Sequence, residues 1–473
     1  MTKKNLTCMA ATAASAALFF FGVGLHPVAA LAWLAPLPIL LLAPRCRAKT
    51  AAASAFAASL LGSTNSWDYF LRSLSIPLPA ALVIVLGSAA VFAAATLVFR
   101  ALLANGRPLL AAIAVPSIWV TALYGASLAS PTGVIGTLST TQADFPAVIQ
   151  VASITGAWGI EFLVILAPAA LAVLAAPGIP ARARLRAPAL LAVTLAAVLG
   201  YGFARLSTVD EQHHTRRVAV LARTDRHWAV DVATPAGRDL VQSYVDAIEG
   251  LPDGVRIVVL PEGSFAADES SLPLLTGPLT QAARAKGTDI VAGLIDREKG
   301  VRFNTALDLR ATGAPLTYRK WNTGGAPDIE PGRDLSISDG VALEVCMDVN
   351  FPRPSRDYGR LGAGLAAIPA SDEDVDGWQH SRAALLRAVE NGFGVAWSAQ
   401  RGMPTLTDAH GRVLAETHTG GPSPFAVAVA DVPAGTGPTF YARSGDWFAW
   451  LSTGLALVTL AGLRFSSVLS PAP

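Results

Sequence analysis

Residues 341–352 read VALEVCMDVNFP, an apolar run that ends at a cysteine and then turns polar. A short run of this kind, rich in Val and Leu, predicts a buried β-strand, so Cys346 would lie where that strand ends. Two further strand-like runs end in a similar way. RIVVLPE brings Glu262 to a strand end, and FNTALDLR is followed closely by Lys320. We therefore expect the three side chains to meet at one edge of a sheet, where α/β domains place their sites.

Helical patterns alternate with these strands through the middle of the chain. GRDLVQSYVDAIEGL, PLLTGPLTQAARAKG and WQHSRAALLRAVENG each follow an apolar strand-like run. Alternation of apolar strands with helices predicts an α/β domain whose sheet is covered by helices. We assign this domain to residues 206–440.

Glu262, Lys320 and Cys346 form a candidate nucleophile system. A free thiol has a pKa near 8.5 and needs a nearby base or cation to become a good nucleophile. Glu262 would accept the thiol proton, and Lys320 would stabilise the oxyanion of a tetrahedral intermediate. The competing interpretation is that a lone cysteine in a strand is only a small buried hydrophobe. Cys8 and Cys46 fall in or beside apolar sequence and no CxxC pair occurs, so we expect no disulfide within the domain, no metal and no cofactor.

The rest of the chain is strongly apolar. Of the 473 residues 52% are hydrophobic and only 15% are charged, whereas a soluble domain carries about 25% charged residues. The net charge of +2 is too small to favour nucleic acid as a partner. A membrane span needs roughly 20 apolar residues, and eight runs are candidates: 7–24, 27–44, 50–66, 77–104, 109–130, 147–177, 187–204 and 447–464. The sequence thus predicts a polytopic α-helical membrane domain, with seven spans in residues 1–205 and one in residues 441–473 before a short cytoplasmic tail.

The basic residues indicate how these spans are oriented. In chain order they are Lys3 and Lys4; Arg45, Arg47 and Lys49; Arg100 and Arg107; Arg182, Arg184 and Arg186; and Arg464. If the spans alternate in direction, every cluster faces one side, and the positive-inside rule assigns that side to the cytoplasm. The α/β domain is therefore expected on the extracytoplasmic face. Glu161, inside the sixth run, either lies near the outer interface, facing a cavity, or is a functional group.

Several stretches resemble a known family. VVLPEGSF, TYRK and LEVCMDVNFP are similar to the three catalytic signatures of the nitrilase (carbon–nitrogen hydrolase) superfamily, whose domain is an α-β-β-α sandwich. Within that superfamily, a domain held between seven spans and an eighth resembles the apolipoprotein N-acyltransferases. VIQVASITGAWGIEFLV, DGWQHSRAALLRAVENG and YARSGDW extend the resemblance over nearly the whole chain.

The resemblance implies a two-step reaction in a bacterial inner membrane, with the catalytic domain on the periplasmic face. Cys346 would take an acyl chain from a membrane phospholipid as a thioester. The N-terminal amine of a diacylglyceryl-cysteine apolipoprotein would then accept it, with Glu262 as base and Lys320 as oxyanion stabiliser. The alternative is a membrane-anchored amidase, or an acyltransferase with a different amine acceptor.

The sequence departs from the family pattern in its substrate-facing loops. After the lysine it reads KWNTGGAPDIEPG, so the family's auxiliary carboxylate falls to Asp328 or Glu330. PASDEDVDG stands where the family has an aromatic-containing segment, and its acidic run is expected to attract a cationic acceptor amine. Asp348, Trp378 and His380 are further candidate site residues.

Overall fold

The computed structural model describes residues 3–74, 76–207 and 215–468, with side chains as far as residue 463. Arg464, the last of the basic residues above, therefore has no described side chain. Contacts divide the chain into two compact units. The helical unit takes Met1–Leu128, Gly136–Arg205 and Asp446–Pro473, and the sandwich unit takes Ala129–Ile135 and Leu206–Gly445. Each unit is described separately below.

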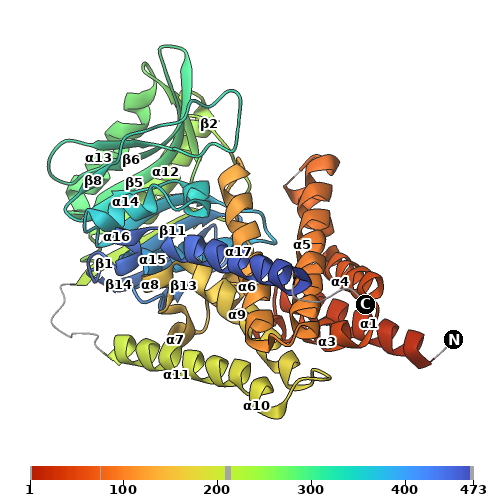
Figure 1. The fold of residues 1–473 in the computed structure, drawn as a ribbon. Helices are drawn as coiled ribbons and strands as arrows, with labels where there is room; N and C mark the ends of the chain where they lie inside the picture. The colour runs from red at the N-terminus through yellow and green to blue at the C-terminus, as the bar shows by residue number, and fades with distance from the viewer. Residues whose placement is uncertain (1–2, 75, 208–214, 469–473) are drawn as a thin grey trace. The chain divides into compact units, whose positions relative to one another are not determined.

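The helical unit consists of helices of very different length (Figure 1). They are α1 (Lys3–Gly22), α2 (Ala29–Ala32), α3 (Leu37–Leu42), α4 (Ala48–Gly62), α5 (Leu78–Ala104), α6 (Pro108–Ala129), α7 (Pro146–Ile149), α8 (Ala152–Thr155), α9 (Ala157–Leu174), α10 (Ala181–Arg184), α11 (Arg186–Ser207) and α17 (Trp447–Val468). Short 3₁₀ or π segments, η1 (Ala43–Arg45), η2 (Ser63–Ser66), η3 (Tyr69–Ser73) and η4 (Thr140–Gln142), lie between some of them.

Within the described residues, five helical segments are long and apolar enough to cross a membrane: Lys3–Gly22, Leu78–Ala104, Pro108–Ala129, Ala157–Leu174 and Ala181–Ser207. The predicted second span is broken into α2, α3 and η1. Pro36, Pro38 and Pro44 account for the breaks, because proline lacks the backbone N–H that a helix interior needs. The predicted third span, α4, has only 15 residues. The membrane character of this unit is confirmed, and the count of eight spans is approximate.

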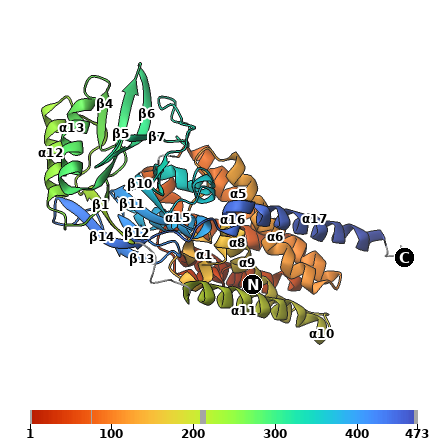
Figure 2. The same cartoon turned by 90° about the vertical axis from the view of Figure 1, so that its left-hand side faces the viewer.

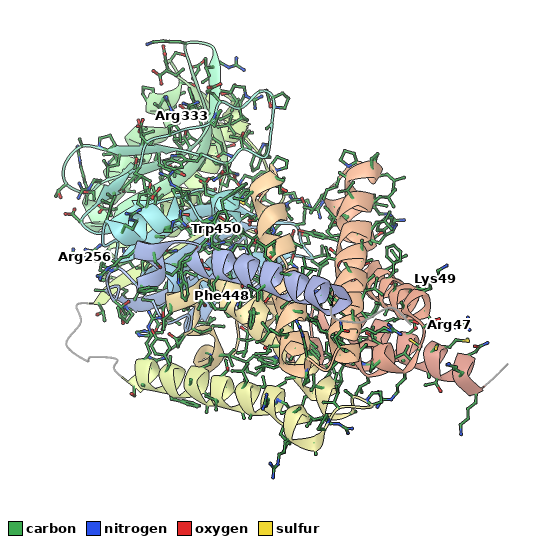
Figure 3. All side chains as sticks on the ribbon, in the orientation of Figure 1. Arg47, Lys49, Arg256, Arg333, Phe448 and Trp450 are labelled. Carbon is green, nitrogen blue, oxygen red and sulfur yellow. The ribbon has the colours of Figure 1, made fainter. Side chains whose placement is uncertain are left out.

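Glu161 is a buried acidic group inside the helical unit, and its carboxylate is hydrogen-bonded. The carboxylate of Glu161, which is 1% exposed, accepts hydrogen bonds from Trp119 Nε1 at 3.1 Å and from the Ser139 backbone N–H at 2.6 Å. These contacts hold the turn before α7 against α6 and α9, so they favour the interpretation of Glu161 as a packed group. In α17, Phe448 stacks edge-on against Phe162, while Trp450 is 62% exposed (Figure 3).

Two β-sheets form the centre of the sandwich unit. The first has the order β14-β1-β3-β5-β4-β2, with β6 beside β5 and β7 beside β6, and the second has the order β13-β12-β11-β10-β9-β8. Their bounds are β1 (Thr215–Arg223), β2 (Val230–Asp231), β3 (Ile257–Val259), β4 (Phe265–Asp268), β5 (Asp289–Glu298), β6 (Val301–Leu309), β7 (Leu316–Arg319), β8 (Ile337–Ser338), β9 (Val341–Leu343), β10 (Leu365–Ser371), β11 (Gly394–Gln400), β12 (Thr405–Thr407), β13 (Val413–Glu416) and β14 (Phe425–Pro433). In both sheets the central strands are parallel, β1-β3-β5 in one and β9-β10-β11 in the other.

Helices cover the outer faces of both sheets. In Figure 2, α12 (Pro235–Glu249) and α13 (Leu272–Lys286) lie on one side of the strands, and α15 (Gly377–Asn391) lies on the other. The short helices α14 (Ser355–Arg360) and α16 (Phe440–Ser444) lie beside α15. One buried cluster joins the two sheets through residues such as Val259, Ile368 and Trp397. A second cluster fills the layer under α12 and α13. The predicted α-β-β-α sandwich is confirmed.

Candidate active site

Glu262 and Lys320 form a buried ion pair. Glu262 follows β3, and Lys320 follows β7. Lys320 Nζ donates to Glu262 Oε1 at 2.7 Å, and the two side chains are only 8% and 4% exposed. Burial alone would lower the pKa of Lys320, but the charges of Glu262, Cys346 and Asp348 raise it above its ordinary value. Lys320 therefore carries its positive charge at neutral pH in a buried position, where electrostatic effects are strong.

Cys346 begins η5 (Cys346–Asn350), just after β9, with a backbone φ of +41°. A residue other than glycine rarely adopts this left-handed backbone conformation, because it is strained. Strained backbone of this kind is concentrated at functional sites. Its thiol donates to the Ser371 carbonyl oxygen, with Sγ at 3.4 Å. Burial raises the pKa of the thiol well above its ordinary value, Glu262 raises it further, and Lys320 opposes the shift. The resting thiol is therefore neutral and needs a base.

Asp348 holds the loop that carries the cysteine. Its Oδ2 accepts from the Tyr318 hydroxyl at 2.7 Å and from the Val345 backbone N–H at 3.2 Å, while Oδ1 accepts from the backbone and side-chain nitrogens of Asn322 at 2.9 Å. Asp348 is fully buried. The structure thus brings this candidate to the site, as an anchor between the loops after β7 and β9.

Asn304 is a residue at the site that sequence reasoning missed. It lies on β6, and its Nδ2 donates to Glu262 Oε1 at 2.7 Å, the same oxygen that Lys320 binds. Two donors therefore fix one carboxylate oxygen and leave the other for a proton. The side chain of Asn304 is buried, and its Oδ1 has no partner among the described residues. The strand also contains Arg302, Thr305 and Asp308, so the sequence alone did not set Asn304 apart.

Trp228 is a second residue that the sequence analysis did not single out. A carbon placed on Gly263, next to Glu262, would lie 2.5 Å from the Trp228 ring, so the ring rests directly on this backbone. Trp228 is nevertheless 51% exposed. An ion pair between Arg226 and Asp374 ties its loop to the loop after β10. Together these loops place an exposed aromatic ring beside the base.

The two candidates for the auxiliary carboxylate both have exposed side chains. The carboxylate of Asp328 is 58% exposed and pairs with Arg302. Glu330 is exposed, and its backbone N–H bonds to the Arg302 carbonyl. Because both side chains are exposed in the structure, the assignment of an auxiliary carboxylate to Asp328 or Glu330 stays a prediction. The residues from Trp321 to Gly332 are half-buried or exposed, so this loop runs along the surface.

The acidic run after β10 is neutralised within the sandwich unit. Asp372 bonds to His380 at 2.9 Å, Glu373 pairs with Arg401 at 2.8 Å, and Asp374 pairs with Arg226. Asp372 and Asp376 are buried, at 2% and 0% exposure, and the expectation that this run attracts a cationic acceptor amine stays a prediction.

The helix that follows the acidic run forms as predicted. It spans Gly377–Asn391 and buries Leu385, Leu386 and Val389. Trp378 stacks over Arg382, with the guanidinium carbon 5.8 Å from the ring centre. His380 faces the acidic run, and the charge of Glu262 contributes to the raised pKa of His380. Trp378 and His380 both remain candidate site residues.

Asp372, Asp376 and His380 have ligand atoms within 4.8 Å of one another, as a metal site would require. However, His380 Nδ1 is bonded to Asp372 Oδ1, and Nε2 lies 3.7 Å from Asp376 Oδ2. The two ring nitrogens thus face different carboxylates. We interpret the cluster as a carboxylate–imidazolium–carboxylate chain.

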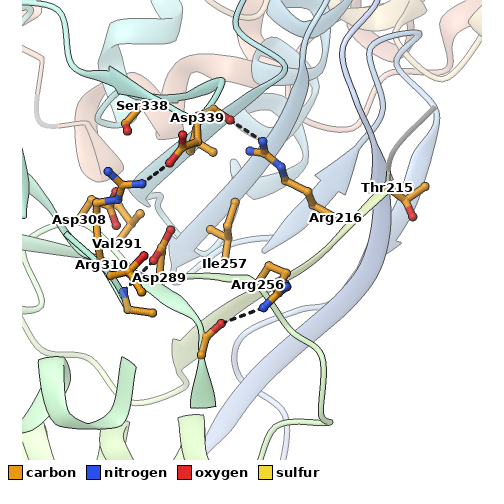
Figure 4. A pocket seen from close by; sticks show the side chains of 14 residues that line it. Thr215, Arg216, Arg256, Ile257, Asp289, Val291, Asp308, Arg310, Ser338 and Asp339 are labelled. Atoms are coloured by element: carbon orange, nitrogen blue, oxygen red, sulfur yellow. Dashed lines mark hydrogen bonds and ion pairs between the residues drawn. The ribbon is translucent and has the colours of Figure 1, made fainter. Parts of the chain in front are cut away.

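A pocket of about 400 Å³ lies at the other end of the strands (Figure 4). It is lined by residues that begin β1, β3 and β5, among them Arg256 and Asp289, and by Asp308, Arg310 and Asp339. Glu262 and Cys346, in contrast, follow the carboxyl ends of β3 and β9. The pocket and the candidate site are therefore separate, and we assign no function to the pocket.

Family models match both parts of the chain. Residues 15–170 match the apolipoprotein N-acyltransferase N-terminal domain, and residues 222–439 match the carbon–nitrogen hydrolase domain. The second match contains Glu262, Lys320 and Cys346.

Curated relatives agree with these models. An apolipoprotein N-acyltransferase of Geobacter metallireducens is 26% identical over 404 residues, which cover 75% of each chain. One of Thermotoga maritima is 33% identical over 147 residues, covering 28% of this chain and 27% of the relative. An (R)-stereoselective amidase of Pseudomonas is 28% identical over 184 residues, 34% of this chain and 67% of the amidase.

Solved structures similar to the chain include Saccharomyces cerevisiae Nit3, with 18% identity, a TM-score of 0.39 and coverage of 46% of this chain and 90% of Nit3. They also include an amidase mutant from Nesterenkonia, with 21% identity, a TM-score of 0.39 and coverage of 50% and 96%. The two matched domains define a membrane-bound enzyme of the nitrilase superfamily. The chain belongs to the apolipoprotein N-acyltransferase family.

Proposed function

We propose that this chain is an apolipoprotein N-acyltransferase that carries the acyl chain as a thioester on Cys346. The observation that carries the proposal is the neutral, strained thiol of Cys346 within the electrostatic reach of a buried Glu262–Lys320 pair. The match of the helical unit to the acyltransferase N-terminal domain favours a lipid substrate over a water-soluble amide.

In the first step, Glu262 accepts the thiol proton, and the thiolate attacks the ester carbonyl carbon of a phospholipid. Negative charge develops on the carbonyl oxygen, and the ammonium of Lys320 stabilises it. The carbon–oxygen bond of the ester then breaks. The lysophospholipid leaves as an alcohol, taking the proton back from Glu262, and the acyl chain remains on Cys346 as a thioester.

In the second step, an amine attacks the thioester. Its neutral nitrogen forms the new amide bond and passes a proton to Glu262 as the tetrahedral intermediate collapses. The Cys346 thiolate leaves and regains this proton from Glu262, so the enzyme returns to its starting state. The acceptor would be the N-terminal amine of a diacylglyceryl-cysteine lipoprotein.

Exposed apolar side chains fit a lipid substrate. Trp228 is 51% exposed and Val375 is 42% exposed. They lie in the two loops that the Arg226–Asp374 ion pair joins, one of which rests on the backbone beside Glu262. An acyl chain bound there would remove apolar surface from water, which is favourable.

The basic clusters support a periplasmic catalytic unit. Arg47 and Lys49 lie beside one another at the start of α4 (Figure 3), and Arg182 and Arg184 lie in α10. With the positive-inside rule, these clusters would face the cytoplasm, and the sandwich unit would face the side where lipoproteins mature.

The proposal is tested by giving the purified full chain a labelled phospholipid, together with either a diacylated lipopeptide or a small aliphatic amide. We expect label to move to the lipopeptide amine, with release of lysophospholipid. Ammonia release from the amide, without any lipid turnover, would instead support a membrane-anchored amidase and contradict the proposal.

A further inference from the structure

We propose that His380, held as an imidazolium between Asp372 and Asp376, is a positioning residue for Cys346. It fixes the loop whose Ser371 carbonyl accepts the thiol hydrogen, so that loss of the imidazolium proton at alkaline pH releases the loop and slows attack by the thiol. The inference deepens the proposed function, since it names a residue that would control the thioester-forming step.

The loop is closed by contacts at both of its ends. It runs from Asp372 to Asp376 and joins β10 to α15. His380 lies one turn into α15, with Nδ1 2.9 Å from Asp372 Oδ1 and Nε2 3.7 Å from Asp376 Oδ2. One ring therefore holds both ends of a five-residue loop.

Asp372 transmits this constraint to the nucleophile. Its carboxylate also accepts from Trp397 Nε1 at 3.3 Å, and its backbone N–H donates to the Gln400 carbonyl at 2.9 Å. The residue before it, Ser371, carries the carbonyl that binds the Cys346 thiol at 3.4 Å. A shift of Asp372 would therefore move the hydrogen-bond acceptor of the thiol.

The charges around His380 explain why it keeps its proton. Asp372 and Asp376 face it from the loop, and Glu262 acts on it from the turn after β3. Burial lowers the pKa of His380, but these carboxylates outweigh burial and raise the pKa to about 9. Without the proton, two buried carboxylates would lose the positive charge that lies between them, which is costly.

The test follows the rate of thioester formation between pH 6 and pH 10.5, in the full chain with labelled phospholipid. For the wild type we expect the rate to fall as the pH rises through about 9. Asp372→Asn keeps the shape of the side chain but removes the main charge partner of His380. The fall in rate at alkaline pH, here called the alkaline limb, should therefore move to a lower pH by about one unit. His380→Asn should slow the reaction at neutral pH at least tenfold and abolish that limb.

Glu373→Gln is the matched control, because it removes a carboxylate of the same loop that pairs with Arg401 and not with His380. Its alkaline limb should match the wild type. A limb at the same pH in wild type, Asp372→Asn and His380→Asn would overturn the inference, and so would a shift in the control alone.

A second measurement separates this inference from the proposed function. Alkylation of Cys346 by iodoacetamide, with Cys8 and Cys46 replaced by Ala, needs a reactive thiol but no lipid transfer. In this background we expect the pH profile of the alkylation rate to change slope near pH 9. Asp372→Asn should move this change of slope to a lower pH. If wild type fails to turn over lipid but shows this displacement, the proposed function fails and the role of His380 stands. If lipid turns over and Asp372→Asn does not move the change of slope, the proposed function stands and the role of His380 fails.

Discussion

At the scale of single residues, we propose that the site combines a neutral thiol, as the nucleophile, with a carboxylate held in place as its base. Cys346 is buried and strained, and burial keeps its thiol protonated. Glu262 has one carboxylate oxygen fixed by Lys320 and Asn304. This arrangement leaves the second oxygen to accept a proton, and it keeps a cation beside the place where negative charge develops. The chemistry therefore depends on desolvation and on orientation together.

The contact of Asn304 with the base gives the first prediction. Asn304→Ala should slow thioester formation by about 10- to 100-fold, because a hydrogen bond to a charged group contributes about 1.5–3 kcal/mol. The neighbouring Thr305→Val is the control, since the Thr305 hydroxyl donates to the carboxylate of Asp296 and not to that of Glu262. Equal rates in both variants, measured by single-turnover labelling, would refute the role given to Asn304.

Glu344 gives a prediction about stability and pH. It is fully buried next to the nucleophile loop, and burial raises its pKa to about 8. The folded state therefore binds this proton more tightly than the unfolded chain does, and stability falls as the pH rises from about 4.5 through about 8. Glu344→Gln cannot ionise. Its thermal unfolding midpoint should match wild type at pH 5 and exceed it at pH 9, and an unchanged difference between the two pH values would contradict the assignment.

At the scale of elements, the site exists because strand ends meet. Glu262 and Cys346 follow parallel strands in different sheets, and Lys320 follows β7, which pairs antiparallel with β6 in the first sheet. The sequence predicted these three positions because short apolar runs followed by polar residues mark strand ends. It did not predict the contacts of Asn304, Trp228 or His380, because those depend on which loops meet in space. The auxiliary carboxylate, assigned to Asp328 or Glu330, stays a prediction, because spacing along a loop does not determine whether the loop turns inward.

The segment Ala129–Ile135 follows a predicted span, yet it belongs to the sandwich unit. Its hydrogen bonds are a second example of contacts that the sequence did not predict. The Val134 N–H donates to the Asn350 carbonyl at 3.3 Å, and Asn350 Nδ2 donates to the Thr132 carbonyl at 3.1 Å. Asn350 ends η5, the segment that Cys346 begins. This segment therefore braces the nucleophile loop.

Gly133 tests this brace. Its φ is +70°, and an added Cβ would lie 2.6 Å from the Asn350 carbonyl oxygen. Gly133→Ala should therefore displace Asn350 and slow thioester formation, in addition to a backbone cost of about 1–2 kcal/mol. Gly300→Ala is the matched control, because Gly300 has a φ of +83° with nothing within 4 Å of the added carbon. Thioester formation at the same rate in both variants would show that the brace has no effect on the nucleophile.

At the scale of the whole molecule, composition predicted a membrane part and an α/β part, and both are present. The number of spans was harder to predict, because hydropathy does not report where prolines such as Pro36 break a helix. The orientation of the chain in the membrane is predicted separately, from the basic clusters that flank the predicted spans. It predicts that the sandwich unit lies outside the cytoplasm.

Cysteine labelling checks this orientation. In a background lacking the native cysteines, Ala314→Cys, in an exposed loop between β6 and β7, should react with an impermeant thiol reagent in intact spheroplasts. Arg182→Cys, exposed in α10, should react only after the membrane is opened. The opposite pattern of labelling would reverse the assigned topology.

The most direct test of the central claim is the mass of the Cys346 peptide after incubation of the full chain with a phospholipid of known acyl composition. We predict that this peptide gains the mass of one acyl chain, that hydroxylamine removes the added mass, and that a diacylated lipopeptide removes it while becoming acylated. Cys346→Ser should show no hydroxylamine-sensitive adduct. Acylation of the lipopeptide at the wild-type rate by Cys346→Ala, or the absence of any adduct during active turnover, would contradict the account.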